Sequence, residues 1–339
     1  MAHSTTQQPK TTAEAVSRIS FGKAINDATR QAMELDRRVF VFGLGVDSQA
    51  GIFGSTAALK DEFGAERVFD TPVSEQALTA VAAGAANAGL RPVLVHQRFD
   101  FMFYTMDQFA NWISLWRFKS SGQSGMPLTI RAIVGKGWGQ GPQHAKSLHA
   151  WFAHLVGMQV VMPSSPTEAK GLLLSSIFSN DPTIVIEGRS LYSMEEDVPD
   201  APYFIRLGRA LVRRPGSDVT VVAIGSLIPA ALQAAVQLEQ EGVSAEVIDL
   251  RTLVPLDSET VVTSVSKTRR LVVADPAWRS YGAAAEVMAT VVEKVGTDLK
   301  ARPRRVTWPD SHVPTSASLE AEYYPTAEDI AAACRESVL

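Results

Sequence analysis

The stretch DTPVSEQALTAVAAGAANAGLRPVLVHQRFDF, residues 70–101, most constrains the fold, because it orders a turn, a helix and a buried strand in direct succession. Pro72 is compatible only with a loop or a first helical turn. Residues 77–88 are almost all alanine and glycine, which predicts a helix lying close to a neighbour, ended by Gly89. The apolar run 93–95 predicts a strand buried on both faces.

Glu75 is the acidic residue between that turn and that helix. Because the helix is too apolar for a solvated face, we expect the Glu75 carboxyl group to be partly buried. The alternative is an exposed glutamate, which the helix dipole favours in a first turn. Most glutamates are exposed, so the wider pattern has to decide between the two readings.

Composition indicates a globular protein with two domains. The chain has 339 residues, 46% of them hydrophobic, and a mean hydropathy of +0.03. Its net charge of −4 gives no reason to expect nucleic acid or an anionic membrane as partner. Cys334 is the only cysteine, which excludes an intrachain disulfide and a cysteine-based zinc site. Without an apolar signal-peptide core or membrane span, we expect a cytoplasmic protein.

Helix and strand patterns alternate along the chain, which predicts two open-sheet α/β domains. Expected strands are 38–43, 128–134, 183–187, 219–224, 245–250, 270–274 and 305–308. Expected helices include 21–35, 106–118, 169–178, 229–241 and 281–295, with caps at Ser20, Ser165 and Thr326. We predict a flexible tail at 1–17, a first domain at 18–194, a charged, proline-rich linker at 195–218 and a second domain at 219–339.

A glycine-rich loop, GKGWGQGPQH, follows the strand at 128–134 and ends at His144. It is neither a P-loop nor a dinucleotide-binding fingerprint, and its glycines suit either close backbone approach to a ligand or plain flexibility. A lone histidine is usually structural, although its pKa suits proton transfer near neutrality. A helix over 145–154 should follow. His149 and His154 are not spaced as a metal-binding pair, so we expect them to be structural.

Several motifs share one resemblance: DTPVSE, AGLRP, a Phe-x-Phe pair, MDQ, GPQHAKSLHAWF, DLRTLVPLD and EYYPTAEDI. In this order they resemble the β subunit of thiamine-diphosphate-dependent 2-oxo acid dehydrogenases, the E1 component. The resemblance runs from about Phe21 to the C-terminus. It implies a pyrimidine-binding domain of the transketolase type, followed by a transketolase C-terminal domain that serves assembly.

The resemblance also implies roles for residues at matching positions. Glu75 would contact the aminopyrimidine ring of thiamine diphosphate, which a carboxyl group sheltered from water does best. Phe101 would pack on the ring face, unless it is ordinary core. Val73 and Gln97 would complete the cofactor-binding set. His144 would face the reacting carbon, as a second catalytic residue.

The chain departs from the family pattern at two places. Leu44 stands where an acidic residue usually helps to relay protons between paired active sites, which argues against such a relay here. His96 and Arg98 make the segment HQRFDF unusually polar. Arg98 would pair structurally with Asp100, or Arg98 or His96 would bind a carboxylate or phosphate of the substrate. The substrate then need not be pyruvate or a branched-chain oxo acid.

The resemblance further implies ions and a partner. Magnesium and the diphosphate require a Gly-Asp-Gly motif with asparagine ligands, which this chain lacks. An E1 α subunit should carry that motif, and the usual assembly contains two α and two β subunits. A structural potassium ion would be held by the backbone carbonyls of Leu128, Ser176, Ile177, Ser179 and Asp181.

Three functions are open at this point. The first is decarboxylation of a 2-oxo acid with acyl transfer to a lipoyl E2 carrier. The second keeps the cofactor but passes the carbanion to an aldehyde, as transketolases and acyloin synthases do. The third is a non-catalytic assembly subunit, against which the presence of both Glu75 and His144 argues.

Overall fold

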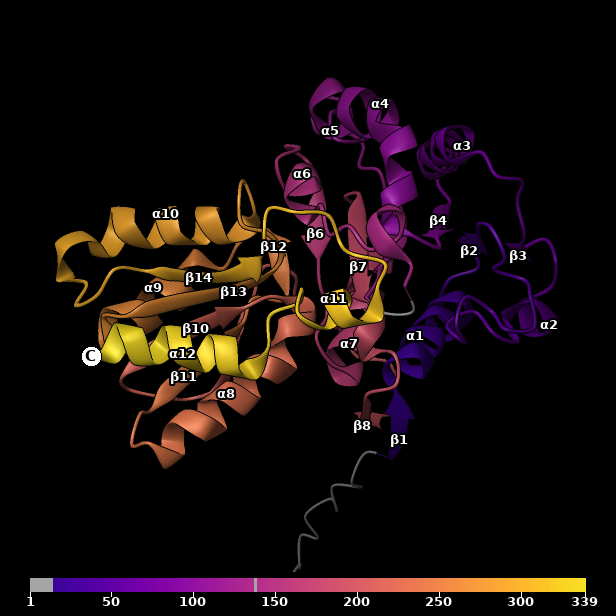
Figure 1. The fold of residues 1–339 in the computed structure, drawn as a ribbon. Coiled ribbons are helices and arrows are strands. Elements are labelled where there is room, and N and C mark those ends of the chain that lie inside the picture. The colour runs from indigo at the N-terminus through magenta and orange to yellow at the C-terminus, as the bar shows by residue number, and fades with distance from the viewer. Residues whose placement is uncertain (1–14, 137–138) are drawn as a thin grey trace, which may run out of the picture.

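Two open sheets of mainly parallel strands organise the computed structural model, which describes residues 15–136 and 139–339 (Figure 1). The first sheet has the strand order β12-β6-β7-β5-β4-β2-β3, and the second has the order β14-β13-β10-β11-β9. The edge strands β12 and β9 each pair antiparallel with their neighbours, β6 and β11. Helices lie on both faces of each sheet, so the predicted class of two open-sheet α/β domains is confirmed.

The strands of the first sheet are β2 (Val39–Phe42), β3 (Val68–Phe69), β4 (Arg91–His96), β5 (Thr129–Val134), β6 (Gln159–Val161), β7 (Thr183–Gly188) and β12 (Thr252–Val254). Those of the second are β9 (Leu211–Arg214), β10 (Val219–Ala223), β11 (Ala245–Asp249), β13 (Leu271–Trp278) and β14 (Arg304–Trp308). The longer helices are α1 (Phe21–Leu35), α3 (Glu75–Asn87), α7 (Pro166–Phe178), α8 (Ile228–Gln240), α9 (Ser258–Thr268), α10 (Ala283–Val295) and α12 (Ala327–Val338).

Local capping explains where three of these helices begin. The Ser20 hydroxyl accepts a hydrogen bond from the backbone N–H of Lys23 (3.2 Å) and starts α1. Ser165 precedes α7 and accepts from the N–H of Glu168, and Thr326 opens α12 with a reciprocal capping box. All three caps are as the sequence predicts.

A continuous hydrophobic core joins the two domains. Helices α1 and α7 cover one face of the first sheet, whereas α8 and α12 cover one face of the second. The apolar cluster on the remaining faces includes Leu94 and Ile130 from the first sheet and Val222 and Ile248 from the second. Because this cluster spans both sheets, it holds the second domain against the first.

Two helices predicted from the sequence are shorter than expected. The segment 106–118 is divided into α4 (Met106–Gln108), a π-helical turn (Phe109–Ile113) and α5 (Trp116–Lys119). The wider turn places Phe109 and Ile113 together in the core. The helix after His144 is only α6 (His149–Ala153), because the side chain of Asp100 holds the non-helical backbone before it through the N–H of Lys146 (3.2 Å).

The predicted linker contains two strands. One is β8 (Glu195–Pro199), which pairs antiparallel with β1 (Val16–Ser20), and the other is β9. Both are largely exposed edge elements, so their polar sequence resembles that of a linker. Residues 16 and 17 of the predicted tail belong to β1, and residues 1–14 lie outside the described part of the chain. The domain boundaries stay predictions.

A buried ion pair joins the middle of β5 to the carboxyl-terminal part of β7. Nε and Nη2 of Arg131 donate to the two carboxylate oxygens of Glu187 (2.6 and 3.0 Å), and both side chains are fully buried. The Tyr192 hydroxyl donates to the same carboxylate. Nη2 of Arg131 also donates to the hydroxyl of Ser55 (2.7 Å), which lies in the loop after β2. The network therefore ties two interior strands of the first sheet to the loop after β2.

We predict that Glu187→Gln lowers the free energy of unfolding by about 3–5 kcal/mol, because it leaves the buried Arg131 without a counter-charge. Urea denaturation of the wild-type and variant chains measures the difference. The matched control is Glu239→Gln, which removes a pair with Arg214 on a mostly exposed carboxylate and should change stability little. Equal losses in both variants would contradict a special role for the buried network.

Candidate active site

A cavity of about 540 Å³ lies outside the carboxyl end of β4, where open α/β sheets bind ligands. All six residues that the sequence analysis assigned to cofactor or substrate binding line it: Val73, Glu75, His96, Gln97, Arg98 and Phe101. Leu44 and Tyr104 line it as well. Tyr104 was not predicted as a site residue from the sequence, although it belongs to the aromatic run FDFMFYT.

Glu75 is the first residue of α3 and is half-buried, as expected. Within the described part of the chain, its carboxylate forms no hydrogen bond or ion pair, so it is available to a ligand in the cavity. Val73 stands two residues earlier and is 70% exposed. The expectation that α3 lacks a solvated face is wrong for this chain, because Ala77, Ala80 and Val81 are exposed. The alanine-rich sequence of α3 suggested burial because it is apolar, but small alanine side chains are also compatible with an exposed helix face.

Phe101 lines the cavity and contacts His144, which is not itself a lining residue. Their ring centroids are 5.5 Å apart in an edge-on arrangement, and both side chains are half-buried. Phe101 does not end a strand as expected, because β4 stops at His96 and a 3₁₀ segment (Phe99–Thr105) follows. This segment turns Phe99 and Met102 into the core and leaves Phe101 at the cavity wall. The structure thus brings together two residues that are far apart in sequence.

The loop after β2 closes one side of the cavity. Nε2 of Gln97 donates to the backbone carbonyl of Leu44 (2.9 Å), and the N–H of Gly45 donates to Oδ1 of Asp70 (2.6 Å). Leu44 is 37% exposed and contributes an alkyl side chain to the cavity lining. At this point of the wall the chain therefore offers no titratable group.

His96 and Arg98 are both only 5% exposed. Burial lowers the pKa of His96 to about 4, so its imidazole is neutral at neutral pH, and its Nε2 has no hydrogen-bond partner. The structural pairing of Arg98 with Asp100 is not found among the described residues. Asp100 instead accepts hydrogen bonds from the backbone N–H and from Nζ of Lys146, both at 3.2 Å.

His149 has a structural environment, as the sequence analysis expected. It is fully buried, with Nε2 2.9 Å from Oδ1 of Asp275 and Nδ1 3.0 Å from the Ser147 hydroxyl. Oδ2 of Asp275 accepts from the N–H of Ala284 (2.9 Å) at the start of α10. This chain of hydrogen bonds crosses from the first domain to the second and holds the start of α6, five residues after His144.

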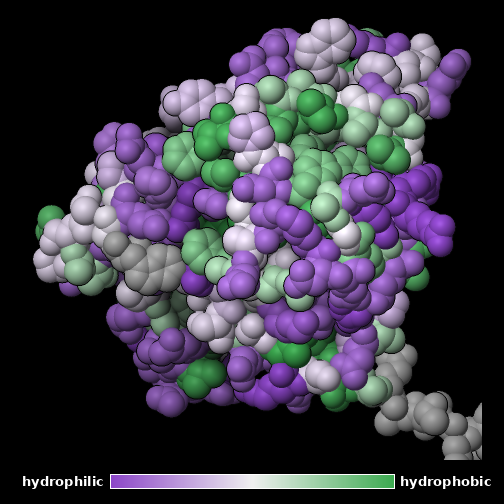
Figure 2. All heavy atoms as spheres, turned by 90° about the vertical axis from the view of Figure 1, so that its right-hand side faces the viewer, coloured by the Kyte–Doolittle hydropathy of each residue, from purple (hydrophilic) through white to green (hydrophobic). Residues whose placement is uncertain are grey.

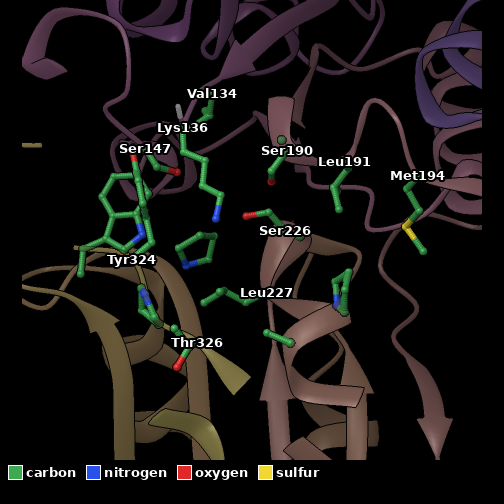
Figure 3. A pocket seen from close by; sticks show the side chains of 18 of the residues that line it. Val134, Lys136, Ser147, Ser190, Leu191, Met194, Ser226, Leu227, Tyr324 and Thr326 are labelled. Carbon is green, nitrogen blue, oxygen red and sulfur yellow. The ribbon is translucent and has the colours of Figure 1, made fainter. Parts of the chain in front are cut away.

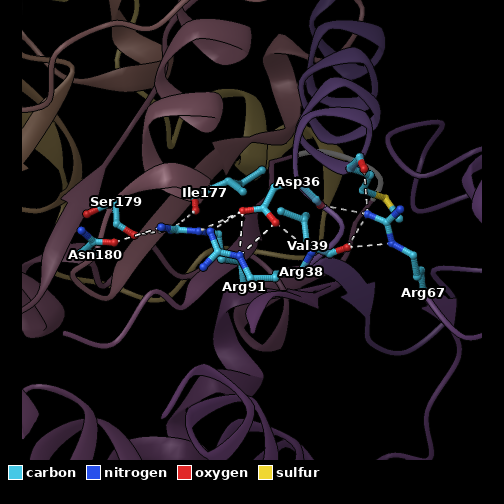
Figure 4. A network of polar contacts seen from close by, with 9 residues as sticks. Asp36, Arg38, Val39, Arg67, Arg91, Ile177, Ser179 and Asn180 are labelled. Atoms are coloured by element: carbon cyan, nitrogen blue, oxygen red, sulfur yellow. Dashed lines mark hydrogen bonds and ion pairs between the residues drawn. The ribbon is translucent and has the colours of Figure 1, made fainter. Parts of the chain in front are cut away.

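Two of the five carbonyl groups considered for potassium, those of Ile177 and Ser179, lie beside Arg91 (Figure 4). Nη1 of Arg91 donates to the carbonyls of Ile177 (3.0 Å) and Ser179 (2.9 Å), and Nη2 donates to Oδ1 of Asn180 (3.0 Å). The other three carbonyls already accept hydrogen bonds within the chain: Leu128, Ser176 and Asp181. A guanidinium next to these carbonyls would repel a cation. The residues present do not fit potassium well, and its binding stays a prediction.

A larger cavity, of about 850 Å³, lies between the two domains and apart from the predicted site residues. Figure 3 shows Lys136 and Ser190 entering it from the first domain and Ser226 from the second. Nζ of Lys136 lies 5.3 Å from the ring centroid of Tyr324. In residues 15–136 and 139–339, no cluster of three metal-ligating side chains and no helix able to span a membrane is found.

We predict that His96 makes stability depend on pH. The unfolded chain binds a proton on this imidazole below about pH 6.5, whereas the folded chain excludes the proton until about pH 4. Above pH 6.5 the buried neutral imidazole of His96 therefore does not lower the free energy of unfolding. As the pH falls from 6.5 towards 4, protonation of His96 in the unfolded chain lowers that free energy by up to about 3 kcal/mol. Urea unfolding between pH 7.5 and 4.5 should show a flatter profile for His96→Gln. The exposed His154→Gln serves as control, and identical slopes in all three proteins would contradict the assignment.

Comparison with known proteins places these observations in a family. The chain matches the pyrimidine-binding domain of transketolase over residues 17–195 and the transketolase C-terminal domain over residues 208–330. The pyruvate dehydrogenase E1 component subunit beta of Bacillus subtilis (strain 168) is 39% identical over 315 residues, which is 93% of this chain and 97% of that protein. The same subunit from Staphylococcus epidermidis (strain ATCC 12228 / FDA PCI 1200) is 41% identical over 309 residues, covering 91% and 95%.

Two further matches differ in name. The beta subunit of acetoin:2,6-dichlorophenolindophenol oxidoreductase from Bacillus subtilis (strain 168) is 39% identical over 325 residues, covering 92% of this chain and 95% of that one. A solved structure described as a split-gene transketolase, inactive beta4 tetramer, has a TM-score of 0.76 and 24% identity, covering 94% and 98%. At that identity the likeness concerns the fold alone. Since both domains and nearly the whole length are matched, this chain belongs to the family of E1 component beta subunits built on the transketolase fold.

Proposed function

We propose that this chain is the β subunit of a thiamine-diphosphate-dependent E1-type enzyme, which decarboxylates a 2-oxo acid and transfers the acyl group to a lipoyl carrier. One observation carries the proposal: a single cavity is lined by an unpartnered Glu75 carboxylate and by Phe101, whose ring touches His144. Curated relatives named as pyruvate dehydrogenase E1 beta subunits support it.

Glu75 would hold a proton on the cofactor's pyrimidine. Thiamine diphosphate supplies an electron sink that accepts the carbon–carbon bond pair of the substrate. The carboxyl group of Glu75 lies at the start of α3, half-buried and without another partner among the described residues. It is therefore placed to share a proton with a ring nitrogen, and limited water access strengthens that hydrogen bond.

Three other residues would shape the cofactor half of the cavity. Phe101 presents an aromatic ring suited to packing against a planar heterocycle. Val73 stands at the open side of the cavity and would become covered when the ring is bound. Gln97 lines the same space and is held there by the hydrogen bond that its Nε2 donates to the carbonyl of Leu44. Together they bind and orient a ring, and they leave proton transfer to Glu75.

His144 would deliver the proton that acyl transfer requires. It ends a 3₁₀ turn (Gly141–Gln143) after the glycine-rich loop and contacts Phe101 from the side. When a lipoyl disulfide opens, one sulfur takes the acyl group and the other needs a proton. Imidazole side chains commonly act as general acids in such a step.

The site would be completed by a partner subunit. Val73 and Tyr104 line the cavity and are also strongly exposed, and Val81 adds to the apolar surface of α3. Figure 2, which views the side of α2 (Leu59–Phe63) and α3, shows hydrophobic side chains gathered in its upper part. We propose that an E1 α subunit with the Gly-Asp-Gly motif covers this surface and holds magnesium and the diphosphate. The assembly would contain two α and two β subunits.

Two features of the family, a proton relay between active sites and the identity of the acceptor, need separate treatment in this chain. Leu44 gives no titratable group at the position of the usual acid, so we assign no proton relay between active sites. Transfer to an aldehyde is the second candidate function, and a test for lipoyl acylation separates the two.

The lone cysteine, Cys334, is free and buried, which suits a reducing cytoplasm.

We predict that Glu75→Gln reduces turnover by roughly 10² to 10⁴ in the complex with the α subunit, because general acid–base catalysis typically contributes that much. Exchange of the C2 proton of the bound cofactor with solvent measures the affected step directly. Assembly should be intact. The control is Glu66→Gln, an exposed carboxylate outside the cavity. Exchange at the wild-type rate in folded Glu75→Gln would refute the role.

We predict that His144→Ala abolishes acylation of a lipoyl domain, whereas decarboxylation with an artificial electron acceptor survives at a substantial fraction of the wild-type rate. The reason is that only the lipoyl acceptor needs the donated proton. The exposed His154→Ala is the matched control. Equal loss of lipoyl acylation and of decarboxylation with the artificial acceptor would contradict this role and would indicate that His144 binds the substrate. Absence of lipoyl acylation in the wild type, with carbon–carbon bond formation instead, would favour the aldehyde reading.

A further inference from the structure

Arg98 is a buried cation without an anionic partner among residues 15–136 and 139–339. It is 5% exposed, lines the candidate cavity, and has an Nη1 with no hydrogen-bond partner. Its guanidinium carbon lies 5.6 Å from the ring centroid of Phe53. Within the described residues no carboxylate forms an ion pair with it, since nearby Asp100 pairs with Lys146 (3.2 Å). The chain therefore holds an unneutralised guanidinium beside the cavity.

The surroundings of Arg98 favour an incoming anion. Burial lowers the pKa of Arg98, and the positive charge of Arg189 lowers it further. The negative charge of Asp100 raises this pKa but does not cancel the effect of burial. The guanidinium carbon of Arg189 lies 4.5 Å from the centroid of the same Phe53 ring, so two cations share one aromatic side chain. Gly135 leaves room for the guanidinium, because a Cβ there would come within 2.7 Å of its Nη1. Burial of an unpaired charge is costly, and a bound anion would remove that cost.

His96 adds a neutral hydrogen-bonding group to the same place. It lies two residues before Arg98, is equally buried, lines the same cavity and has an unpartnered Nε2. A guanidinium provides charge and a planar fork for two oxygens, and a neutral imidazole provides one further hydrogen bond. Carboxylate and phosphate oxygens match this combination.

We propose that Arg98 binds an anionic group at the far end of the substrate, so that the substrate carries a second carboxylate or a phosphate besides its reacting group. The inference rests on the proposed function and names the substrate class for the same cavity. Arg98 would be a specificity-determining residue, and His96 would assist it.

The bound anion must be one that survives the reaction. A cation on the departing carboxylate would stabilise the ground state more than the transition state, because that carboxylate loses its charge as carbon dioxide leaves. Such binding slows the chemical step. A distal carboxylate or phosphate keeps its charge throughout, so its binding energy positions the substrate without opposing decarboxylation.

Calorimetry with the full chain tests the anion site directly, because residues of this chain form its whole recognition set. Glutarate and inorganic phosphate serve as probes at neutral pH, and they distinguish a carboxylate from a phosphate site. We expect one of them to bind the wild type and to bind Arg98→Met about 10- to 150-fold more weakly. The exposed Arg206→Met is the matched control and should bind like the wild type. No binding of either probe, or equal binding to Arg98→Met, would overturn the proposal.

A stability measurement separates recognition from a structural role. Replacing an unpaired buried charge with methionine should leave the free energy of unfolding unchanged or raise it. Urea denaturation of Arg98→Met in the absence of anions gives the answer. A large loss of stability would show that Arg98 serves the fold, and would contradict the proposal.

Turnover by the complex with the α subunit extends the test to catalysis. For a carboxylate site, 2-oxoglutarate is compared with 2-oxobutyrate, and for a phosphate site a 2-oxo acid with a terminal phosphate is compared with its unphosphorylated form. Arg98→Met should lower kcat/KM about 10- to 150-fold for the substrate with the extra anion only. Equal losses for both members of the pair would overturn the inference. If no donor turns over, the proposed function fails, whereas the calorimetry still decides the role of Arg98.

Discussion

The buried ion pair between Arg131 and Glu187 joins two interior strands of the first sheet, next to β4, the strand beside the candidate cavity. It joins β5 to β7, and Ser55 and Tyr192 extend it to the loop after β2 and the turn after β7. Both charges are fully buried, so they are satisfied only when these segments meet in one arrangement. The glycine-rich loop that carries His144 leaves from the end of β5. Its starting point is therefore fixed by electrostatics as much as by packing.

The candidate site has the character of one half of a larger site. Its cavity offers an unpartnered carboxylate, an aromatic wall and a buried guanidinium, and Val73 and Tyr104 leave it open to the surface. Apolar side chains at such an opening are costly in water and are stabilised when a partner covers them. Arg98 is a second group at this site that needs a partner, because no described residue neutralises its charge. Both features are explained if a subunit and a substrate complete the site.

Sequence reasoning succeeded where the determinants are local. The caps at Ser20, Ser165 and Thr326 follow from hydrogen bonds over three residues, so the sequence predicts them directly. The cavity residues also lie mostly in one stretch, which explains why their grouping was predictable.

Contacts between residues far apart in the chain, and backbone conformations set by tertiary packing, could not be predicted from the sequence. Asp275 meets His149 from the other domain, with no sequence pattern that announces the pair. Arg91 reaches the carbonyls at the C-terminal end of α7 because the fold brings β4 beside them. The π-helical turn at Phe109 and the strands in the predicted linker depend on tertiary packing, which overrides local preference.

The split of the site between two subunits is the central claim, and cofactor binding tests it most directly. Titration calorimetry with thiamine diphosphate and magnesium should be performed on this chain alone, on the α subunit alone and on their complex. The account predicts tight, magnesium-dependent binding only for the complex, since this chain supplies the pyrimidine side and the α subunit the metal and diphosphate. Tight magnesium-dependent binding by this chain alone would contradict it.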